Sequence, residues 1–248
     1  MSKYSEILLS QSVTHYWPLD ETSGSTALAS VGGLDLTISG NVTMNVFAAV
    51  NTGYSFTGNN LSYAAAPLDT TITFQPTFGF SYSLIIKVNN TMGASGAWGI
   101  ISRRSNSSAN RTFAAFMQGS TGGTINFDMG NNQARWNSTF APTQGHYYHI
   151  AFVWNPIDGR YSLYVNGDLY STVTGQAPTI QQANAPFYVA ALGANPANQL
   201  FPGVIDEVAI WNNKSLTDEE IKAQYNAAFP ITRVYDGTEW KFAEKNVL

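Results

Sequence analysis

The chain has 248 residues, a formal net charge of −4, no cysteine, and a charged fraction of 11%, against roughly 25% in an average globular protein. These values exclude disulfide bonds and thiolate metal sites, and the lack of any lysine or arginine run disfavours nucleic-acid binding. No apolar run approaches the ~18 residues of a membrane helix, and residues 7–9 are too short an apolar run for a signal-peptide core. We therefore expect no membrane insertion and a surface of neutral polar side chains.

Short runs of β-branched and aromatic residues, separated by Gly, Asn, Pro and Ser, predict many antiparallel strands. In chain order the expected strands are 15–18, 37–39, 54–56, 80–88, 99–103, 112–118, 124–128, 147–154, 160–165, 168–174, 187–192 and 203–211. Strands of this length and spacing are typical of a β-sandwich.

Two local patterns predict the ends of elements. Asn166 and Gly167 can both take positive φ, which suits a type I′ turn between strands 160–165 and 168–174. Thr217 followed by Glu220 has the spacing of a capping box, which predicts a helix over 216–227 that packs one face on the sandwich.

Three segments together resemble laminin G-like domains of the concanavalin A-like superfamily. Residues 15–26, an aromatic strand entering an acidic Ser-Gly loop, look like the first strand and turn of that family. Residues 201–211 and 216–221 look like its closing strand and capping helix, and residues 147–167 like its central hairpin. The resemblance implies an all-β, two-sheet antiparallel jelly-roll sandwich with adjoining first and last strands and one short C-terminal helix.

We expect three regions along the chain. An N-terminal extension covers residues 1–11, the laminin G-like sandwich covers 12–228, and a C-terminal tail covers 229–248. In the tail, Tyr235, Trp240 and Phe242 are apolar anchors for a partner, unless they fold back on the sandwich.

Residues 19–24 and 234–240 resemble loops and tails of bacteriophage tail and fibre proteins. This resemblance implies a virion tail, fibre or decoration protein that is assembled in the host cytoplasm, with other virion subunits as partners. Outside a virion, we expect an extracellular or cell-surface location. A homo-oligomer is compatible with either setting, although no interface pattern marks one.

Enzyme chemistry is not expected. Relatives that cleave glucans carry their acids as Glu-x-Asp-x-Glu on one strand, and this chain has no such run. Asp206 and Glu207 are adjacent, so on a regular strand their side chains point to opposite faces. His15, His146 and His149 lack the spacing of metal ligands and are expected to be structural. We predict a non-catalytic protein without a cofactor, and a glycoside hydrolase is the less favoured alternative.

The resemblance also implies a structural calcium ion, which many relatives hold at the edge of the sandwich. By motif position the ligands would be Asp20, Asp35 and Asp206. A calcium ion needs several converging oxygens, and acids are sparse in these loops. We favour the alternative, in which Asp20 and Asp206 accept hydrogen bonds from turn amides.

Sugar recognition is the favoured function. Sugars stack on exposed aromatic rings and form hydrogen bonds with amide and cationic side chains. The candidate residues of these kinds, all expected in loops, are Trp98, Arg103, Arg104, Asn131, Asn132, Arg135 and Trp136. The run 131–136 is the best cluster, although Trp136 can instead be a core residue at a strand start. We predict a module that recognises a host-surface carbohydrate or decorates a particle. A purely structural subunit-interaction domain without glycan binding is the alternative.

Overall fold

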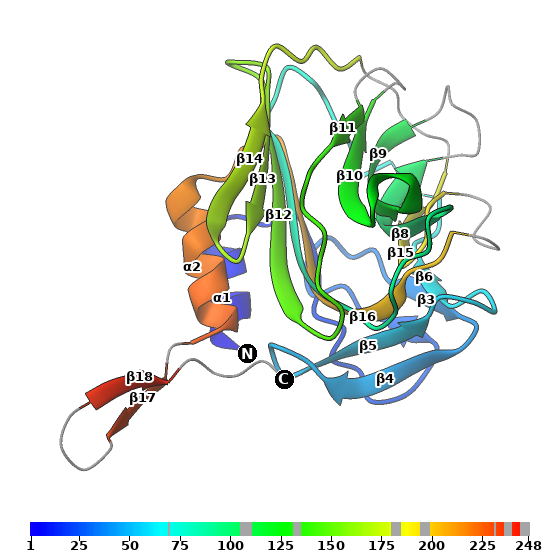
Figure 1. Cartoon of the computed structure of the whole chain (residues 1–248), viewed down its shortest axis with the longest axis vertical. Coiled ribbons are helices and arrows are strands. Elements are labelled where there is room, and N and C mark those ends of the chain that lie inside the picture. Colours follow the sequence, from blue (N-terminus) through cyan, green and yellow to red (C-terminus); the bar gives the residue numbers. More distant parts are fainter. Residues whose placement is uncertain are drawn as a thin grey trace.

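Two antiparallel sheets, stacked face to face, form the body of the protein (Figure 1). This computed structural model describes residues 1–68, 70–104, 111–130, 135–179, 185–193, 199–230, 232–235 and 240–243, and the last two segments by their backbone. The architecture confirms the predicted all-β, two-sheet sandwich.

The first sheet has the strand order β14-β13-β12-β7-β16-β5-β4, and β1 also pairs with β16. Its strands are β1 (His15–Trp17), β4 (Val42–Phe47), β5 (Thr52–Thr57), β7 (Phe80–Val88), β12 (Tyr147–Asn155), β13 (Arg160–Val165), β14 (Asp168–Val173) and β16 (Pro202–Asn212). In the β1–β16 pair, His15 lies opposite Ile210. The expected pairing of the first and last sandwich strands is thereby confirmed.

The second sheet has the order β11-β10-β9-β8-β15-β6-β3-β2. Its strands are β2 (Thr26–Ala27), β3 (Leu36–Ser39), β6 (Tyr63–Ala65), β8 (Ala97–Arg104), β9 (Arg111–Gln118), β10 (Thr124–Met129), β11 (Arg135–Asn137) and β15 (Phe187–Val189). The sequence patterns did not predict β2, β4, β6 or β11, which lie at or near sheet edges where one face is not fully buried.

Aromatic side chains fill the space between the sheets. Tyr82 stacks on Phe152 with ring centroids 5.2 Å apart, and Phe152 stacks on Phe127 at 4.8 Å. Trp17, fully buried, donates its indole N–H to the carbonyl of Leu34 at 2.7 Å. Alternate residues of each strand therefore supply the main core, as period-two patterning requires.

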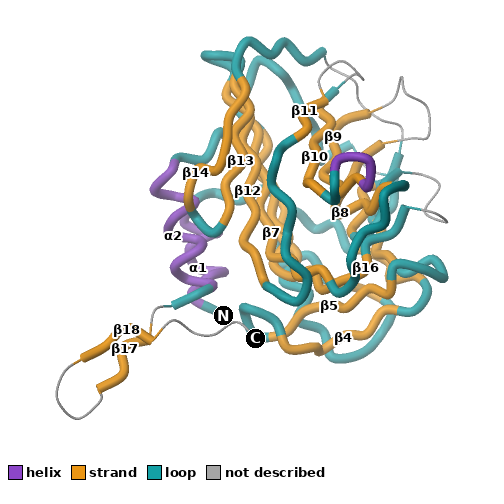
Figure 2. Tube along the Cα trace, viewed as in Figure 1, coloured by secondary structure: helices purple, strands orange, loops and turns teal. Residues whose placement is uncertain are grey.

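Helices α1 (Lys3–Ser10) and α2 (Asp218–Ala228) cover the outer face of the first sheet, side by side (Figure 2). The capping box of α2 is present: Glu220 N–H donates to Thr217 Oγ1 at 3.2 Å, and Thr217 N–H donates to Glu220 Oε2 at 3.0 Å. The sequence analysis did not predict α1. Its Tyr4 and Leu8 are fully buried, so segment 1–11 packs as part of the body. Neither helix is long and apolar enough to cross a membrane, as far as the described residues extend.

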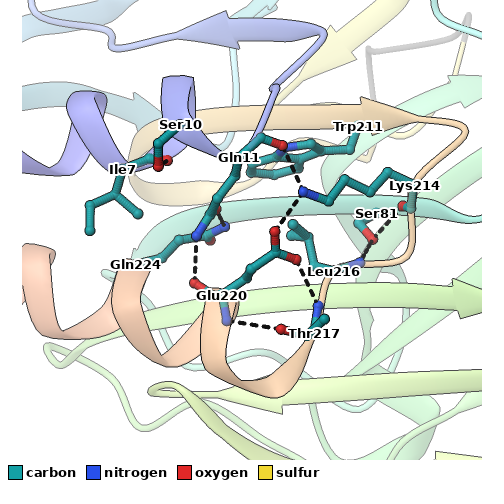
Figure 3. Close-up of polar contacts among 10 residues, drawn as sticks. All are labelled: Ile7, Ser10, Gln11, Ser81, Trp211, Lys214, Leu216, Thr217, Glu220 and Gln224. Atoms are coloured by element: carbon teal, nitrogen blue, oxygen red, sulfur yellow. Dashed lines mark hydrogen bonds and ion pairs between the residues drawn. The ribbon is translucent and has the colours of Figure 1, made fainter.

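Gln11, directly after α1, joins the two helices to the closing strand (Figure 3). Its amide donates to the carbonyl of Glu220 at 2.9 Å and accepts from Gln224 at 2.7 Å. Its backbone carbonyl accepts from the Trp211 indole at 3.1 Å and from Lys214 Nζ at 2.8 Å. Gln11 thus ties the N-terminal segment to β16, to α2 and to the connection between them.

The hairpin between β13 and β14 turns at Asn166 and Gly167, with φ of 54° and 81°. Both values are positive, which confirms the predicted turn. At the C-terminus, β17 (Thr232–Tyr235) and β18 (Trp240–Ala243) form a second hairpin that projects from the body in Figure 1. The side chains of Tyr235, Trp240 and Phe242, the predicted partner anchors, lie outside what the structure describes.

Candidate functional site

Three arginines meet at one aspartate where β8, β9, β10 and β11 lie side by side. Asp128 Oδ2 is 3.0 Å from Arg104 and 2.9 Å from Arg111, and Asp128 Oδ1 is 2.6 Å from Arg135 Nε. Arg135 also donates from its terminal nitrogen to Asp128 Oδ2 at 3.0 Å, which completes a two-point contact. We call Arg104, Arg111, Arg135 and Asp128 the arginine cluster.

Strand register places these four residues together. Asp128 lies opposite Arg135 in the β10–β11 pair, and Arg104 lies opposite Arg111 in the β8–β9 pair. Phe127 belongs to the main core, so alternation turns Asp128 to the other face of the second sheet. The cluster therefore lies on the face opposite to the core.

The cluster carries more positive than negative charge. Asp128 is 1% exposed, and the side chains of Arg104 and Arg111 are 11% and 9% exposed. Burial, and then the charge of Arg111, lowers the pKa of Arg104 to about 10. Burial also lowers the pKa of Arg111, whereas the hydrogen bond to Asp128 raises that of Arg135. Burial is the larger cause of both lowered pKa values, and the excess of positive charge follows from the contacts themselves, in which three guanidinium groups share one carboxylate.

A pocket of about 370 Å³ opens beside the cluster. Arg104 and Arg135 form one part of its lining, with Phe116 and Leu192 as the apolar part and Gln118 and Gln199 as amides. The Arg135 guanidinium lies 5.0 Å from the centre of the Phe116 ring, within the range of a cation–π contact. The pocket thus combines guanidinium, amide and apolar groups.

Two of the predicted glycan-binding residues, Arg104 and Arg135, line this pocket together. Arg103 does not join them: it is 3% exposed and donates to the backbone carbonyls of Ile72 and Ala185. Asn131 and Asn132 lie outside the described residues.

Trp98 and Trp136 lie where the sugar platforms were expected, but their side chains do not have the expected exposure. Both are partly buried and pack against the main core. The Trp136 ring lies 5.5 Å from that of Phe127, on the opposite face from the arginine cluster. The alternative considered for Trp136, a core residue at a strand start, fits this placement.

The sequence analysis did not single out Arg111, Asp128, Phe116 or Gln118. One pattern could have pointed to the cluster: Asp128 is the one acid between Asp69 and Asp158 in the sequence. An isolated buried-strand acid among arginines predicts an ion pair, because a buried charge needs a partner.

The predicted calcium ligands do not gather into one site. Asp20 accepts hydrogen bonds from Asn51 at 3.0 Å and from the Thr52 backbone at 3.2 Å, and Asp35 accepts from the backbone N–H of Ala29 at 2.8 Å. No group of three or more acidic or histidine side chains suited to a metal occurs among the described residues. The donor set of Asp20, Asp35 and Asp206 therefore does not fit a calcium ion. Amide donors engage Asp20, and the backbone N–H of Val50 donates to Asp206 Oδ2 at 3.3 Å, which is the alternative that the sequence predicted.

Asp206 and Glu207 differ from the expectation that they point to opposite faces. Glu207 has φ of 56°, and the β16–β7 register shifts between Asp206 and Ala209. This bulge turns Glu207 to the same side as Asp206, beneath α1, where it accepts a hydrogen bond from the hydroxyl of Tyr16. The two acids form a fully buried pair instead of a strand-alternating one.

The buried acid pair favours the protonated form. Asp206 Oδ1 and Glu207 Oε1 have no hydrogen-bond partner among the described residues. Burial raises the pKa of Glu207 to about 8, and burial together with the nearby Glu207 raises that of Asp206. Because both side chains are closed off from solvent, a substrate cannot reach them in this conformation.

The family model described as "Concanavalin A-like lectin/glucanases superfamily" matches residues 57–222, which is more than half of the chain. The chain belongs to this superfamily. No curated protein matches it by sequence.

Solved structures with this superfamily fold include bacterial toxin domains. The binding domain of Paraclostridial Mosquitocidal Protein 1 aligns with a TM-score of 0.69 at 16% identity, over 90% of this chain and 54% of that one. The binding domain of botulinum neurotoxin DC in complex with rat synaptotagmin II aligns at 0.68 and 15%, over 91% and 54%. The same neurotoxin domain in complex with SialylT aligns at 0.65 and 14%, over 90% and 53%. This superfamily member therefore spans about half the length of these toxin domains and shares their fold.

Proposed function

We propose that this superfamily member is a non-catalytic carbohydrate-recognition module that binds a host-surface glycan in the pocket beside the arginine cluster. The pocket carries the proposal because it brings fixed guanidinium and amide groups to one concave surface, as sugar hydroxyls require for hydrogen bonding. Arg104 and Arg135 are held in place by Asp128, so little side-chain freedom is lost on binding.

Two further observations support recognition instead of hydrolysis. Glycosidases need two carboxyl groups facing a sugar bond, whereas Asp206 and Glu207 are buried beneath α1 on the other sheet. The pocket is lined by arginine, amide and apolar side chains, and no acid occurs among the lining residues that the structure describes. The toxin domains of similar fold are described as binding domains, and one was solved with SialylT, which is in keeping with a binding role.

A glycan array tests the proposal with the full-length protein and an Arg135→Ala variant. We expect the wild-type protein to bind a defined set of glycans and the variant to lose about tenfold or more in affinity, since a hydrogen bond to a charged group contributes about 1.5–3 kcal/mol. The matched control is Arg160→Ala, because Arg160 pairs with an exposed Asp158 on the first sheet. Equal loss in both variants, or no glycan bound by the wild type, would contradict the proposal.

A virion or other assembled setting is the second proposal, with the β17–β18 hairpin as the contact to other subunits. The hairpin projects from the body, and its backbone register sets Tyr235 opposite Trp240 and Arg233 opposite Phe242. Replacing Tyr235, Trp240 and Phe242 by serine is expected to abolish assembly with the partner subunit or self-association, while glycan binding persists. Sedimentation velocity of both proteins measures this, and unchanged association would contradict it.

We propose that the three predicted ligands hold no calcium ion, and melting experiments test this. The predicted ligands do not converge, so we expect the melting temperature to be equal in calcium chloride and in a chelator at constant ionic strength. A rise in melting temperature with calcium that Asp206→Asn removes would instead assign a calcium ion to the buried acid pair.

A further inference from the structure

We infer that the ligand of this pocket is an acidic glycan, and that Arg104 and Arg135 bind its carboxylate or sulfate group. The inference rests on the proposed function, and it adds the chemical class of the sugar.

The positive and negative charges of the arginine cluster do not balance. Asp128 is the single carboxylate within 4.0 Å of the three guanidinium groups in the described part of the chain, and both of its oxygens already accept hydrogen bonds. The neighbouring stretches 105–110 and 131–134 contain Ser, Asn, Gln and Ala but no Asp or Glu. The cluster therefore holds two positive charges that no acid of its own strands balances.

One hydrogen-bond donor of Arg104, its Nε atom, is unused among the described residues. Nε of Arg104 is buried and has no hydrogen-bond partner among the described residues, and the same holds for Nε of Arg111. A buried donor without a partner is unfavourable, and more so when the group is charged. Arg104 also lines the pocket, so an anionic group bound there offsets the charge of a guanidinium group whose hydrogen-bonding capacity is incompletely used.

The position of the Arg135 guanidinium group suits an anionic ligand. Arg135 has a side chain that is 32% exposed, and its two-point contact with Asp128 orients the guanidinium group, which also lies 5.0 Å from the centre of the Phe116 ring. Planar guanidinium groups match carboxylate and sulfate oxygens with parallel hydrogen bonds. Gln118 and Gln199 flank these arginines and can donate to the neutral hydroxyls of the same sugar.

The pocket favours a single anionic group over a polyanion. Nucleic-acid binding needs a track of cations that contacts successive phosphates, and the chain carries a net charge of −4. The arginine cluster is local to the ends of four adjacent strands. A sugar bearing one acidic group therefore matches the cluster better than DNA or RNA does.

The test uses the full-length protein on an array of matched pairs. Each sialylated, uronic-acid or sulfated oligosaccharide is compared with its neutral parent, and a single-stranded DNA oligonucleotide serves as the competitor. We expect the acidic member of at least one pair to bind at least tenfold more tightly than its parent. We also expect that binding to weaken with added sodium chloride and to resist the oligonucleotide.

Two variants then locate the site. Arg104→Gln and Arg135→Gln are each expected to reduce the affinity for the acidic glycan at least tenfold and to remove its preference over the neutral parent. Arg160→Gln is expected to change neither. The comparison of acidic with neutral glycans uses the wild-type protein alone. It therefore tests the inference even where a variant does not fold.

The outcomes separate the inference from the proposed function. Binding of neutral and acidic members with equal affinity, lost in Arg135→Gln, would overturn the acidic class and leave carbohydrate recognition intact. No binding to any glycan would overturn both. Displacement of the acidic glycan by the oligonucleotide would also overturn the inference, because it would identify a general polyanion surface.

Discussion

At the scale of single residues, Glu207 makes stability depend on pH. Its carboxyl pKa in the folded protein, about 8, lies above the ordinary 4.5, so the folded state binds its proton more tightly than the unfolded state does. The contribution of Glu207 to the free energy of unfolding is fully present below about pH 4.5 and is lost as the pH rises toward 8. Asp206, whose pKa is also raised, acts in the same direction.

We therefore expect the melting temperature of the wild-type protein to fall between about pH 5 and pH 8, and Glu207→Gln to flatten that fall. Glutamine keeps the acceptor for Tyr16 and removes the ionisation. Glu219→Gln, an exposed position in the first turn of α2, is the control and should leave the wild-type slope in place. A slope that Glu207→Gln leaves unchanged would show that the buried pair does not titrate in this range.

His149 acts in the opposite direction. Its imidazole is fully buried against Gln224, and burial lowers its pKa to about 4. The folded state binds this proton less tightly than the unfolded state, so stability is lost as pH falls from about 6.5 to 4. We expect His149→Gln to reduce acid sensitivity in thermal melts over that interval, compared with His146→Gln. Equal acid sensitivity of the wild type and His149→Gln would contradict the assignment.

At the scale of elements, the β13–β14 turn joins two layers of the molecule. Gly167 has φ of 81°, and a Cβ atom there would lie 2.7 Å from the Cβ of Tyr225 on α2. Gly175 has φ of 70° and open space around the same position. The two glycines share the left-handed backbone and differ in what a side chain would meet.

Gly175→Ala should lower the free energy of unfolding by about 1–2 kcal/mol, the cost of a left-handed alanine. Gly167→Ala should cost a further ~1–3 kcal/mol, because α2 must move away from the hairpin. Urea denaturation of both variants measures the difference. Equal losses would mean that α2 does not press on the turn.

Elements with a strong repeating pattern were predictable. β7 and β13 begin and end where the alternation and turn residues placed them, and Thr217 and Glu220 fixed the start of α2. The cluster was only half predictable: Arg104 and Arg135 were chosen for their chemistry, but their meeting at Asp128 depends on the register of four strands. The Glu207 bulge was not predictable, because period-two alternation assumes a regular strand.

At the scale of the whole molecule, segment 1–11 contributes to stability although it lies outside the matched family region, 57–222. It buries Tyr4 and Leu8 over the first sheet, and Gln11 bonds to α2 and β16. Deleting residues 1–11 should lower the free energy of unfolding by roughly 3–6 kcal/mol from the two side chains alone. The Gln11→Ala variant should lose less of the free energy of unfolding than the deletion does, because the backbone carbonyl of residue 11 still accepts a hydrogen bond from Trp211. A full-length-like melting temperature after the deletion would contradict this role.

The two helices and the arginine cluster lie on opposite outer faces of the sandwich. Segment 1–11 and the pocket therefore lie on opposite sides of the packed core. If the chain is attached to a larger body on the side of α1, the pocket beside the arginine cluster faces away from the attachment. Keeping the two faces apart in this way needs no hinge, because the sandwich between them is a packed core.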